Sequence, residues 1–364
     1  MRIRTARLLQ PGQRIRVLVV DDSVVIRRLV CHALEEDPGL EIVGVAGNGQ
    51  IALSRIPQLN PDVITLDIEM PVMDGLAMLR ELRRRDRAIP VVMFSTMTER
   101  GASATLEALS LGADDYVTKA SNAGSLDVSL ANLRQQLIPK IRQFFESARP
   151  EPTLLPAFRT TPDRAAVHVG TPRERRAVAI GVSTGGPAAL ATVVPQFPAG
   201  FRLPIFIVQH MPPLFTRLLA ERLATLTPLA VREAVQGEIA EPGCIYIAPG
   251  DQHMRVISSE SGPAIALDQT PPLNSCRPAV DALFSSLADV YGPAVVAAVL
   301  TGMGHDGTSG AERLAARGAY ILAQDEATSV VWGMPGAVVS AGVANQILPL
   351  EQVVPVILRE VGAA

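Results

Sequence analysis

The chain has 364 residues, of which 48% are hydrophobic and 4% aromatic, and its formal net charge is −3. This length and apolar content predict about two domains with ordinary cores. The mixed charges and the few aromatic side chains argue against a nucleic-acid partner, because they predict neither a basic surface nor a stacking platform.

No segment of the sequence has the pattern of a secretory signal or of a helix that spans a membrane. Residues 1–14 are arginine-rich and lack the apolar core of a secretory signal, and the apolar run 294–300 is too short to span a bilayer. The three cysteines, Cys31, Cys244 and Cys276, lie far apart without a Cys-x-x-Cys pair, so we interpret them as ordinary thiols of a reducing compartment. We therefore expect a soluble, cytoplasmic protein that is not embedded in a membrane.

Strands and helices alternate over the first part of the chain. The continuous apolar run Val17–Val20 is typical of a strand that is buried on both faces, and Ser23 can cap the helix that follows. Further strands are expected at 41–46, 63–66, 90–94 and 115–117, with helices at 49–56, 75–83 and 102–109 and a last helix that ends near residue 145. This order predicts a flavodoxin-like, doubly wound sheet of five parallel strands.

Prolines interrupt the pattern after this domain, and a second alternation begins at residue 177. Strands are expected at 178–180, 205–208, 244–247, 264–267, 294–300 and 320–322, and helices at 188–194, 215–224, 279–290, 310–316 and 350–358. We predict an extension at 1–14, a first domain at 15–140, a linker at 141–176, and a second α/β domain at 177–364 with a doubly wound, mostly parallel sheet.

Acidic residues follow two of the predicted strands in the first domain. Asp21 and Asp22 end the first strand and Asp67 ends the third, and the carboxyl ends of parallel strands meet at one edge of a sheet. Three carboxylates that repel one another favour a bound Mg²⁺, and Asp67 is our expected phosphoryl acceptor. Ser95 and Lys119 end two further strands and would hold phosphoryl oxygens. Taken singly, each residue could equally be a helix cap or a surface charge.

This arrangement resembles the receiver domains of two-component response regulators over residues 15–137. The resemblance is carried by Asp21-Asp22-Ser23, by Asp67 with Met70-Pro71-Val72-Met73-Asp74-Gly75 after it, by Ser95 and by Lys119. It implies a Mg²⁺ ion held by Asp22, Asp67 and the main-chain carbonyl of Glu69, with Asp21 contributing through water.

The same resemblance implies a switch. Ser95 and Tyr116 would move together when Asp67 is phosphorylated. Receivers usually place a proline after the conserved lysine, whereas Ala120 stands there in this chain, which leaves the local main-chain conformation open.

A second kind of chemistry begins where the first ends. The run Gly181-Val182-Ser183-Thr184-Gly185 follows an apolar strand and fits G-x-S-x-G, the pattern of a nucleophilic serine on a strand-to-helix turn. The free N–H groups of the next helix could stabilise an oxyanion. A plain glycine-rich turn or a phosphate-binding loop would fit the same residues, although the Walker lysine and the dinucleotide pattern are absent.

A serine nucleophile needs a base, and His210 directly follows the next predicted strand. Asp306 follows the apolar run 294–300 and could orient that imidazole, or it could cap the next helix. His210 could also be structural. We expect His253 to lie on a loop, and the chain order of serine, histidine and aspartate differs from that of α/β-hydrolases.

The second half is similar to the catalytic domain of the chemotaxis protein-glutamate methylesterases, the CheB family. The runs that carry this resemblance are 181–187, Val208-Gln209-His210-Met211-Pro212, Ile247-Ala248-Pro249-Gly250-Asp251, Arg277-Pro278-Ala279-Val280-Asp281, 301–307, Gln324-Asp325-Glu326 and Gly333-Met334-Pro335. The resemblance implies a triad of Ser183, His210 and Asp306, with main-chain N–H groups of Thr184 and Met303 as oxyanion donors. His253 is expected to be structural, and His305 receives no role.

The resemblance also implies a reaction and its control. Methyl esters of glutamate side chains would be hydrolysed, and glutamines deamidated, on methyl-accepting chemotaxis receptors, without a cofactor at the hydrolase site. A chemotaxis histidine kinase would phosphorylate the receiver, which otherwise covers the hydrolase site. Two alternatives stay open at this point: an inactive adaptor that only docks on receptors, and a DNA-binding response regulator, which would need a basic helix-turn-helix.

Overall fold

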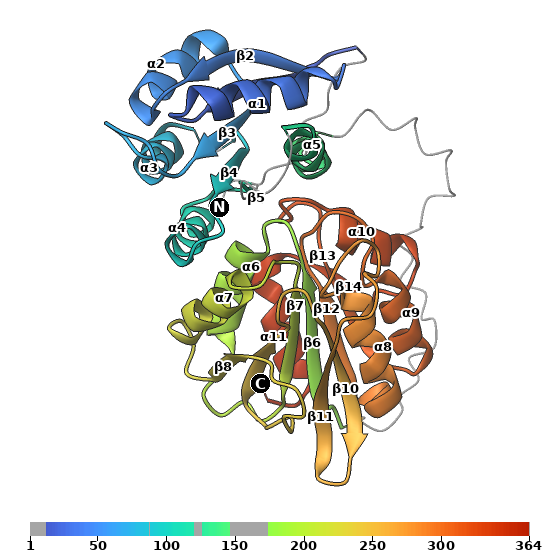
Figure 1. The fold of residues 1–364 in the computed structure, drawn as a ribbon. Helices are drawn as coiled ribbons and strands as arrows, with labels where there is room; N and C mark the ends of the chain where they lie inside the picture. The colour runs from blue at the N-terminus through green and yellow to red at the C-terminus, as the bar shows by residue number, and fades with distance from the viewer. Residues whose placement is uncertain (1–11, 87, 120–125, 146–173, 364) are drawn as a thin grey trace.

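Two α/β domains, drawn one above the other in Figure 1, form the described part of this computed structural model. The structure describes residues 12–86, 88–119, 126–145 and 174–363. Most of the predicted N-terminal extension and linker, together with Ala120, lie outside the described residues. No helix in the described ranges is long and apolar enough to cross a membrane.

The N-terminal domain contains a sheet of five parallel strands in the order β2-β1-β3-β4-β5. The strands are β1 Ile15–Val20, β2 Leu40–Ala46, β3 Val63–Asp67, β4 Val91–Ser95 and β5 Asp115–Thr118. Their pairing confirms the predicted doubly wound sheet, and it places the ends of β1 and β3 side by side.

Five helices cover the two faces of this sheet. They are α1 Val24–Glu35, α2 Gly49–Leu59, α3 Gly75–Arg85, α4 Glu99–Ser110 and α5 Leu126–Arg142. Helices α1 and α5 pack together on one face, while α2, α3 and α4 follow one another on the other. The Ser23 side chain accepts the N–H of Ile26, which confirms its predicted role as the cap of α1.

The C-terminal domain contains a sheet of seven strands, and every neighbouring pair is parallel. In spatial order the strands are β14 Gln346–Leu348, β13 Tyr320–Gln324, β12 Val295–Val299, β6 Ala177–Val182, β7 Ile205–Gln209, β9 Cys244–Ile247 and β8 Ala230–Glu233. A separate antiparallel hairpin of β10 His253–Ser259 and β11 Gly262–Asp268 projects from the end opposite the N-terminal domain (Figure 1).

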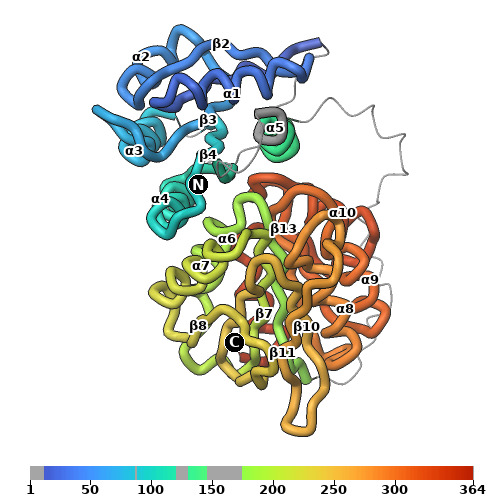
Figure 2. Tube along the Cα trace, in the orientation of Figure 1, coloured from blue at the N-terminus to red at the C-terminus, as the bar shows by residue number. Residues whose placement is uncertain are grey.

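Helices also cover both faces of this second sheet. One face carries α6 Gly186–Val193, α7 Phe215–Ala224 and α11 Val353–Glu360, and the other carries α8 Val280–Val290, α9 Thr308–Ala316 and α10 Gly333–Ser340. Figure 2 shows α4 and α5 as the helices of the N-terminal domain nearest to this domain. The described residues after the linker thus form a sheet protein rather than a helix-turn-helix, which removes the DNA-binding alternative.

Four elements of the second domain, β8, β10, β14 and α10, were not predicted. Strand β8 lies at the sheet edge and ends in the charged pair Arg232 and Glu233, so it lacks the apolar run of a buried strand. Helix α10 contains Gly333, Pro335 and Gly336, which are weak helix formers. The prediction that His253 lies on a loop was wrong, because this residue begins β10.

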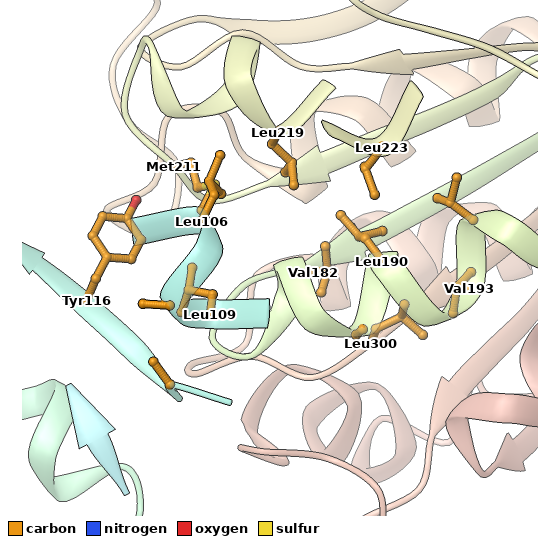
Figure 3. Packing of buried hydrophobic residues seen from close by; sticks show 14 of the residues in the cluster. Leu106, Leu109, Tyr116, Val182, Leu190, Val193, Met211, Leu219, Leu223 and Leu300 are labelled. Atoms are coloured by element: carbon orange, nitrogen blue, oxygen red, sulfur yellow. The ribbon is translucent and has the colours of Figure 1, made fainter. Parts of the chain in front are cut away.

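The two domains share one apolar cluster. Leu106 and Leu109 of α4 belong to the same buried cluster as Met211 and Leu219 of the C-terminal domain (Figure 3). Burial of apolar surface is favourable by roughly 25 cal/mol per Å². The domains therefore pack against each other in this state rather than merely sharing a chain.

Candidate active site and the domain interface above it

Three neighbouring strands, β12, β6 and β7, bring the predicted triad to one edge of the C-terminal sheet. Ser183 follows β6 directly, and its N–H donates to Thr301 O at 3.0 Å. His210 follows β7 and donates its N–H to Val182 O at 3.2 Å, while Asp306 lies in the loop after β12. Residues that are far apart in the sequence thus meet because parallel strands end together.

His210 and Asp306 form a close pair, with 2.8 Å between Nε2 of the ring and Oδ2 of the carboxylate. The carboxylate also accepts the main-chain N–H groups of Val280 at 2.7 Å and Asp281 at 3.1 Å, at the start of α8. The next helix, α9, is capped by Gly307, so Asp306 is not the cap of that helix. Its charge is instead stabilised by the N-terminus of α8.

The surroundings of this pair favour its charged form. Burial alone would lower the pKa of the His210 imidazole, but the hydrogen bonds with Asp306 and Cys276 raise it to about 9. Burial likewise opposes ionisation of Asp306, yet the hydrogen bond from His210 lowers the pKa of that carboxyl. At neutral pH the imidazole of this state therefore holds a proton and cannot accept another.

Ser183 lies in a crowded position. A Cβ atom added to Gly302 would lie 2.8 Å from Ser183 Cβ, so the loop after β12 passes directly against the serine. Within the described residues, no protein acceptor takes the N–H of Thr184 or Met303, and no hydrogen bond joins Ser183 Oγ to His210. The site thus brings the serine and the imidazole to one place without linking them in this state.

Cys276 makes a contact with His210 that the sequence did not predict. Its Sγ lies 3.5 Å from Nδ1 of His210, on the ring edge opposite Asp306. The side chain is half-buried and lines a cavity of about 480 Å³ between the domains. This contact was not predicted, because only the fold places the thiol beside the imidazole.

Hydrogen bonds from the N-terminal domain reach the residue next to Ser183. Thr184 Oγ1 donates to Asp115 Oδ2 at 3.0 Å. The same carboxylate accepts Lys140 Nζ at 2.6 Å and Gln143 Nε2 at 3.0 Å, both near the end of α5. A buried charged acceptor thus ties β5 to the serine turn.

Aromatic stacking forms a second contact between the domains. The ring of Tyr116 on β5 stacks on Phe215 at the start of α7, with 4.9 Å between the centroids and 11° between the planes. At the exposed rim, Arg217 of α7 forms a salt bridge of 2.8 Å with Glu99 of α4. Both contacts place the N-terminal domain over the carboxyl edge of the C-terminal sheet.

These contacts close the space above the serine. Ser183 and His210 line a cavity of about 40 Å³, whose other walls include Asp115, Tyr116 and Lys140 of the N-terminal domain. That volume suits about one water molecule, whereas sites for small molecules usually enclose about 300–1,000 Å³. A side chain of another molecule does not fit into this space while the domains are packed in this way.

The acidic pocket of the N-terminal domain forms as predicted. Asp21, Asp22 and Asp67 offer carboxylate oxygens within 4.8 Å of one another. Lys119 Nζ lies 2.8 Å from Asp67 Oδ1 and 3.1 Å from Asp21 Oδ2. Burial raises the pKa of Asp67 to about 6, with Lys119 opposing the shift and the charge of Asp21 adding to it. Such a cluster fits a hard divalent cation.

The expected switch residues face away from this pocket. Ser95 Oγ lies 3.1 Å from Gly101 O and accepts a hydrogen bond of 2.6 Å from Thr105 Oγ1, rather than pointing at Asp67. Tyr116 points at the other domain. Glu69 is exposed beside a cavity of about 560 Å³ that Asp22 also lines.

Fold and sites together define a class: a receiver-type domain packed over a serine-hydrolase-type domain. Residues 17–131 match the family described as the response regulator receiver domain, and residues 178–357 match the CheB methylesterase. The chain belongs to the family of protein-glutamate methylesterases/protein-glutamine glutaminases.

Relatives of this name cover almost the whole chain. The protein from Trichodesmium erythraeum is 48% identical, over 96% of this chain and 99% of its own, and the one from a Nocardioides species is 50% identical, over 96% and 95%. The crystal structure of the Thermotoga maritima CheB methylesterase catalytic domain, 40% identical, is similar with a TM-score of 0.50 and covers 52% of this chain and 100% of its own.

Proposed function

We propose that this chain removes methyl groups from glutamate side chains of methyl-accepting chemotaxis receptors, and deamidates receptor glutamines, with Ser183 as the nucleophile. The chain is a phosphorylation-regulated methylesterase by its family and domain content. The observation that supports the site is the pairing of His210 with Asp306 at the sheet edge that also presents Ser183. The alternative of an inactive adaptor finds no support among the relatives, which are named as enzymes.

In the acylation step, the two nitrogens of the His210 imidazole have different roles. Nε2 is engaged by Asp306, which leaves Nδ1 to take the proton from Ser183 Oγ. The oxygen then forms a bond to the ester carbonyl carbon, and the main-chain N–H groups of Thr184 and Met303 stabilise the negative charge on the carbonyl oxygen. Collapse of this intermediate breaks the bond to methoxide, which takes the proton from the imidazole and leaves as methanol.

Deacylation repeats these steps with water. His210 takes a proton from the water while its oxygen attacks the acyl carbon. The ester bond to Ser183 breaks, the serine recovers its proton from the imidazole, and a glutamate side chain is released. A glutamine substrate differs in its leaving group, which departs as ammonia.

Phosphorylation of Asp67 would open the site. A domain of this family takes up a phosphoryl group with Mg²⁺. We assign the ion to Asp22, Asp67 and the carbonyl of Glu69, with Asp21 nearby, and a bound ion would neutralise charge on the transferred phosphoryl group. Lys119 would hold a phosphoryl oxygen, as its present contact with Asp67 indicates.

The signal would pass through the switch residues. If Ser95 turns toward the phosphoryl group and Tyr116 follows it, the stack on Phe215 is lost and the domains part. The phosphodonor in this proposal is a chemotaxis histidine kinase, and the place of action is the cytoplasm.

We also propose the division of the chain into a receiver at 15–140, a linker at 141–176 and a catalytic domain at 177–364.

Methanol release from methylated receptor membranes, with and without a phosphodonor, tests this proposal. The Ser183→Ala enzyme should lose release by at least about 10³-fold while its thermal unfolding stays unchanged. Ser309→Ala, which alters an exposed serine on α9, is the matched control and should retain the normal rate. Near-normal release by Ser183→Ala would exclude this serine as the nucleophile.

A further inference from the structure

Cys276 is not used by the reaction proposed above, yet it contacts the imidazole on which that reaction depends. Its Sγ lies 3.5 Å from Nδ1 of His210, while Nε2 of the same ring is bound to Asp306. Sulfur, protonated imidazole and carboxylate therefore follow one another, as in cysteines that are activated by a neighbouring imidazolium. Because Nδ1 is also the nitrogen that must take the serine proton, Cys276 and Ser183 compete for one atom.

The loop that carries Cys276 is held in an unusual conformation. Asn274 and Ser275 have φ angles of 51° and 63°, in the left-handed region that non-glycine residues rarely adopt. Leu273 and Cys276 exchange two main-chain hydrogen bonds of 3.1 and 2.8 Å, and the Asn274 amide donates to Asp306 at 3.0 Å. Such backbone strain persists only where the surroundings impose it, so the thiol is held against the imidazole.

A buried histidine fixes the two ends of the same loop. His253 is fully buried, and its Nδ1 accepts the N–H of Ala279 at 3.2 Å. Its Nε2 lies 3.2 Å from Pro271 O and donates to it, because Nδ1 acts as the acceptor. His253 thus has a structural role that supports the position of Cys276 between these two residues.

The thiol of Cys276 is accessible, and we expect it to react faster than the other two cysteines. Cys276 lines the cavity of about 480 Å³ between the domains, into which Lys140 and Arg277 also face. Both cations are already paired with carboxylates, Lys140 with Asp115 and Arg277 with Asp251, so the contact that bears on the sulfur is the His210 ring. Burial raises the pKa of Cys31 and of Cys244, which keeps those two thiols protonated and slow to react.

We propose that Cys276 is a modification site at which small disulfides switch off the hydrolase. The thiol gives its proton to solvent, and the thiolate, which lies against the protonated His210 ring, attacks one sulfur of the disulfide. A new sulfur–sulfur bond forms at Cys276, the bond within the reagent breaks, and the leaving thiolate takes up the proton. Cys276 is thereby oxidised and one half of the disulfide is reduced to a thiol, so the step needs no other oxidant.

The attached group would lie beside the nitrogen that must accept the serine proton, and this consequence rests on the role proposed for His210. It would also occupy part of the cavity of about 480 Å³ that His210 lines. A thiol reductant would reverse the exchange and restore activity. The enzyme would then be sensitive to the thiol–disulfide balance independently of phosphorylation.

The test uses the full-length protein and dithiobis(nitrobenzoic acid), an aromatic disulfide whose released thiolate is coloured. We expect one thiol to react at least about tenfold faster than the others at neutral pH. This fast phase should be missing in Cys276→Ser, retained in Cys31→Ser and Cys244→Ser, and slowed in His210→Gln. Methanol release should fall in proportion to the modified Cys276, and dithiothreitol should restore it.

Two outcomes would overturn the inference: a fast phase that persists in Cys276→Ser, or fully modified Cys276 with an unchanged rate of methanol release. The Cys276→Ser enzyme serves as the activity control, because it should keep its own rate after the same treatment. Failure of the untreated enzyme to release methanol would instead contradict the proposed function. The coloured product reports the thiol reaction in either case, so the two failures can be told apart.

Discussion

Protonation of His210 limits the activity of the enzyme while the two domains are packed together. His210 lies between the carboxylate of Asp306 and the thiol of Cys276, and Lys140 lines the same cavities. Of these neighbours, the first two stabilise a protonated ring. The general base is therefore blocked by a proton at the same time as the site is closed to substrate.

This state predicts a pH dependence. Because the pKa of His210 is raised to about 9, the ring is protonated below that pH and becomes a competent base only above it. For the unphosphorylated enzyme, kcat/KM for methanol release should therefore rise with pH and level off above about pH 9. Parallel assays with Ser183→Ala correct for the alkaline hydrolysis of the ester itself.

The companion variant is Asp306→Asn. Without the carboxylate, the pKa of the imidazole should fall, so the rising limb should move to lower pH. The rate at the plateau should fall by about 10³–10⁴-fold, since the imidazolium formed in the reaction is no longer stabilised. A limb that stays in place would show that a group other than His210 controls it.

The acidic pocket predicts that Mg²⁺ stabilises the receiver. The ion would relieve repulsion between Asp21, Asp22 and Asp67, so denaturant unfolding of the full chain should require more denaturant when Mg²⁺ is present. At a concentration about tenfold above its Kd, the gain is about 1.4 kcal/mol. Asp22→Ala should remove most of this gain, whereas Glu35→Ala, an exposed acid on α1, should leave it intact.

At the scale of elements, the position of strand ends explains what could be predicted. Buried strands such as β1, β6 and β12 stand out as apolar runs, so the acids, the serine and the aspartate after them could be assigned to sheet edges. The contacts between the domains, such as the salt bridge Glu99–Arg217 and the stack of Tyr116 on Phe215, could not be predicted. No sequence pattern in either domain encodes the way the two domains pack. The contact of Cys276 with His210 was missed for a different reason, since a strained loop rather than a strand end positions the cysteine.

The contact between β5 and the serine turn should restrain the enzyme more than the contact between α4 and α7. Asp115 is buried and accepts the Thr184 hydroxyl, and a hydrogen bond to a charged group is worth about 1.5–3 kcal/mol. Asp115→Ala should therefore raise the basal rate of methanol release by roughly tenfold or more.

Glu99→Gln is the matched control for that variant, because it breaks an exposed ion pair across the same interface. Such pairs contribute about 0–1 kcal/mol, so its basal rate should rise by less than about fivefold. Both variants should keep their response to a phosphodonor, since neither residue lies in the acidic pocket. Equal effects of the two changes would contradict the proposal that the buried contact restrains the site.

At the scale of the whole molecule, packing of the domains links the two sites thermodynamically. If phosphorylation of Asp67 opens the interface, then anything that weakens the interface must also favour the phosphorylated state, because coupling between two sites is reciprocal. The stack of Tyr116 on Phe215 belongs to this interface, and such aromatic pairs contribute about 0.5–1.5 kcal/mol. Phe215 lies in the other domain and does not touch the acidic pocket.

Phe215→Leu, which keeps an apolar side chain and removes the ring, should therefore act on both sites. We expect its basal methanol release to rise by about two- to tenfold. Its affinity for beryllium fluoride with Mg²⁺, a stable mimic of the phosphoryl group, should increase by the same factor, as measured by titration calorimetry. Leu226→Ala, at an exposed position beyond α7, should change neither quantity. A Phe215→Leu enzyme with a higher basal rate and unchanged affinity would mean that the domains open without any connection to Asp67.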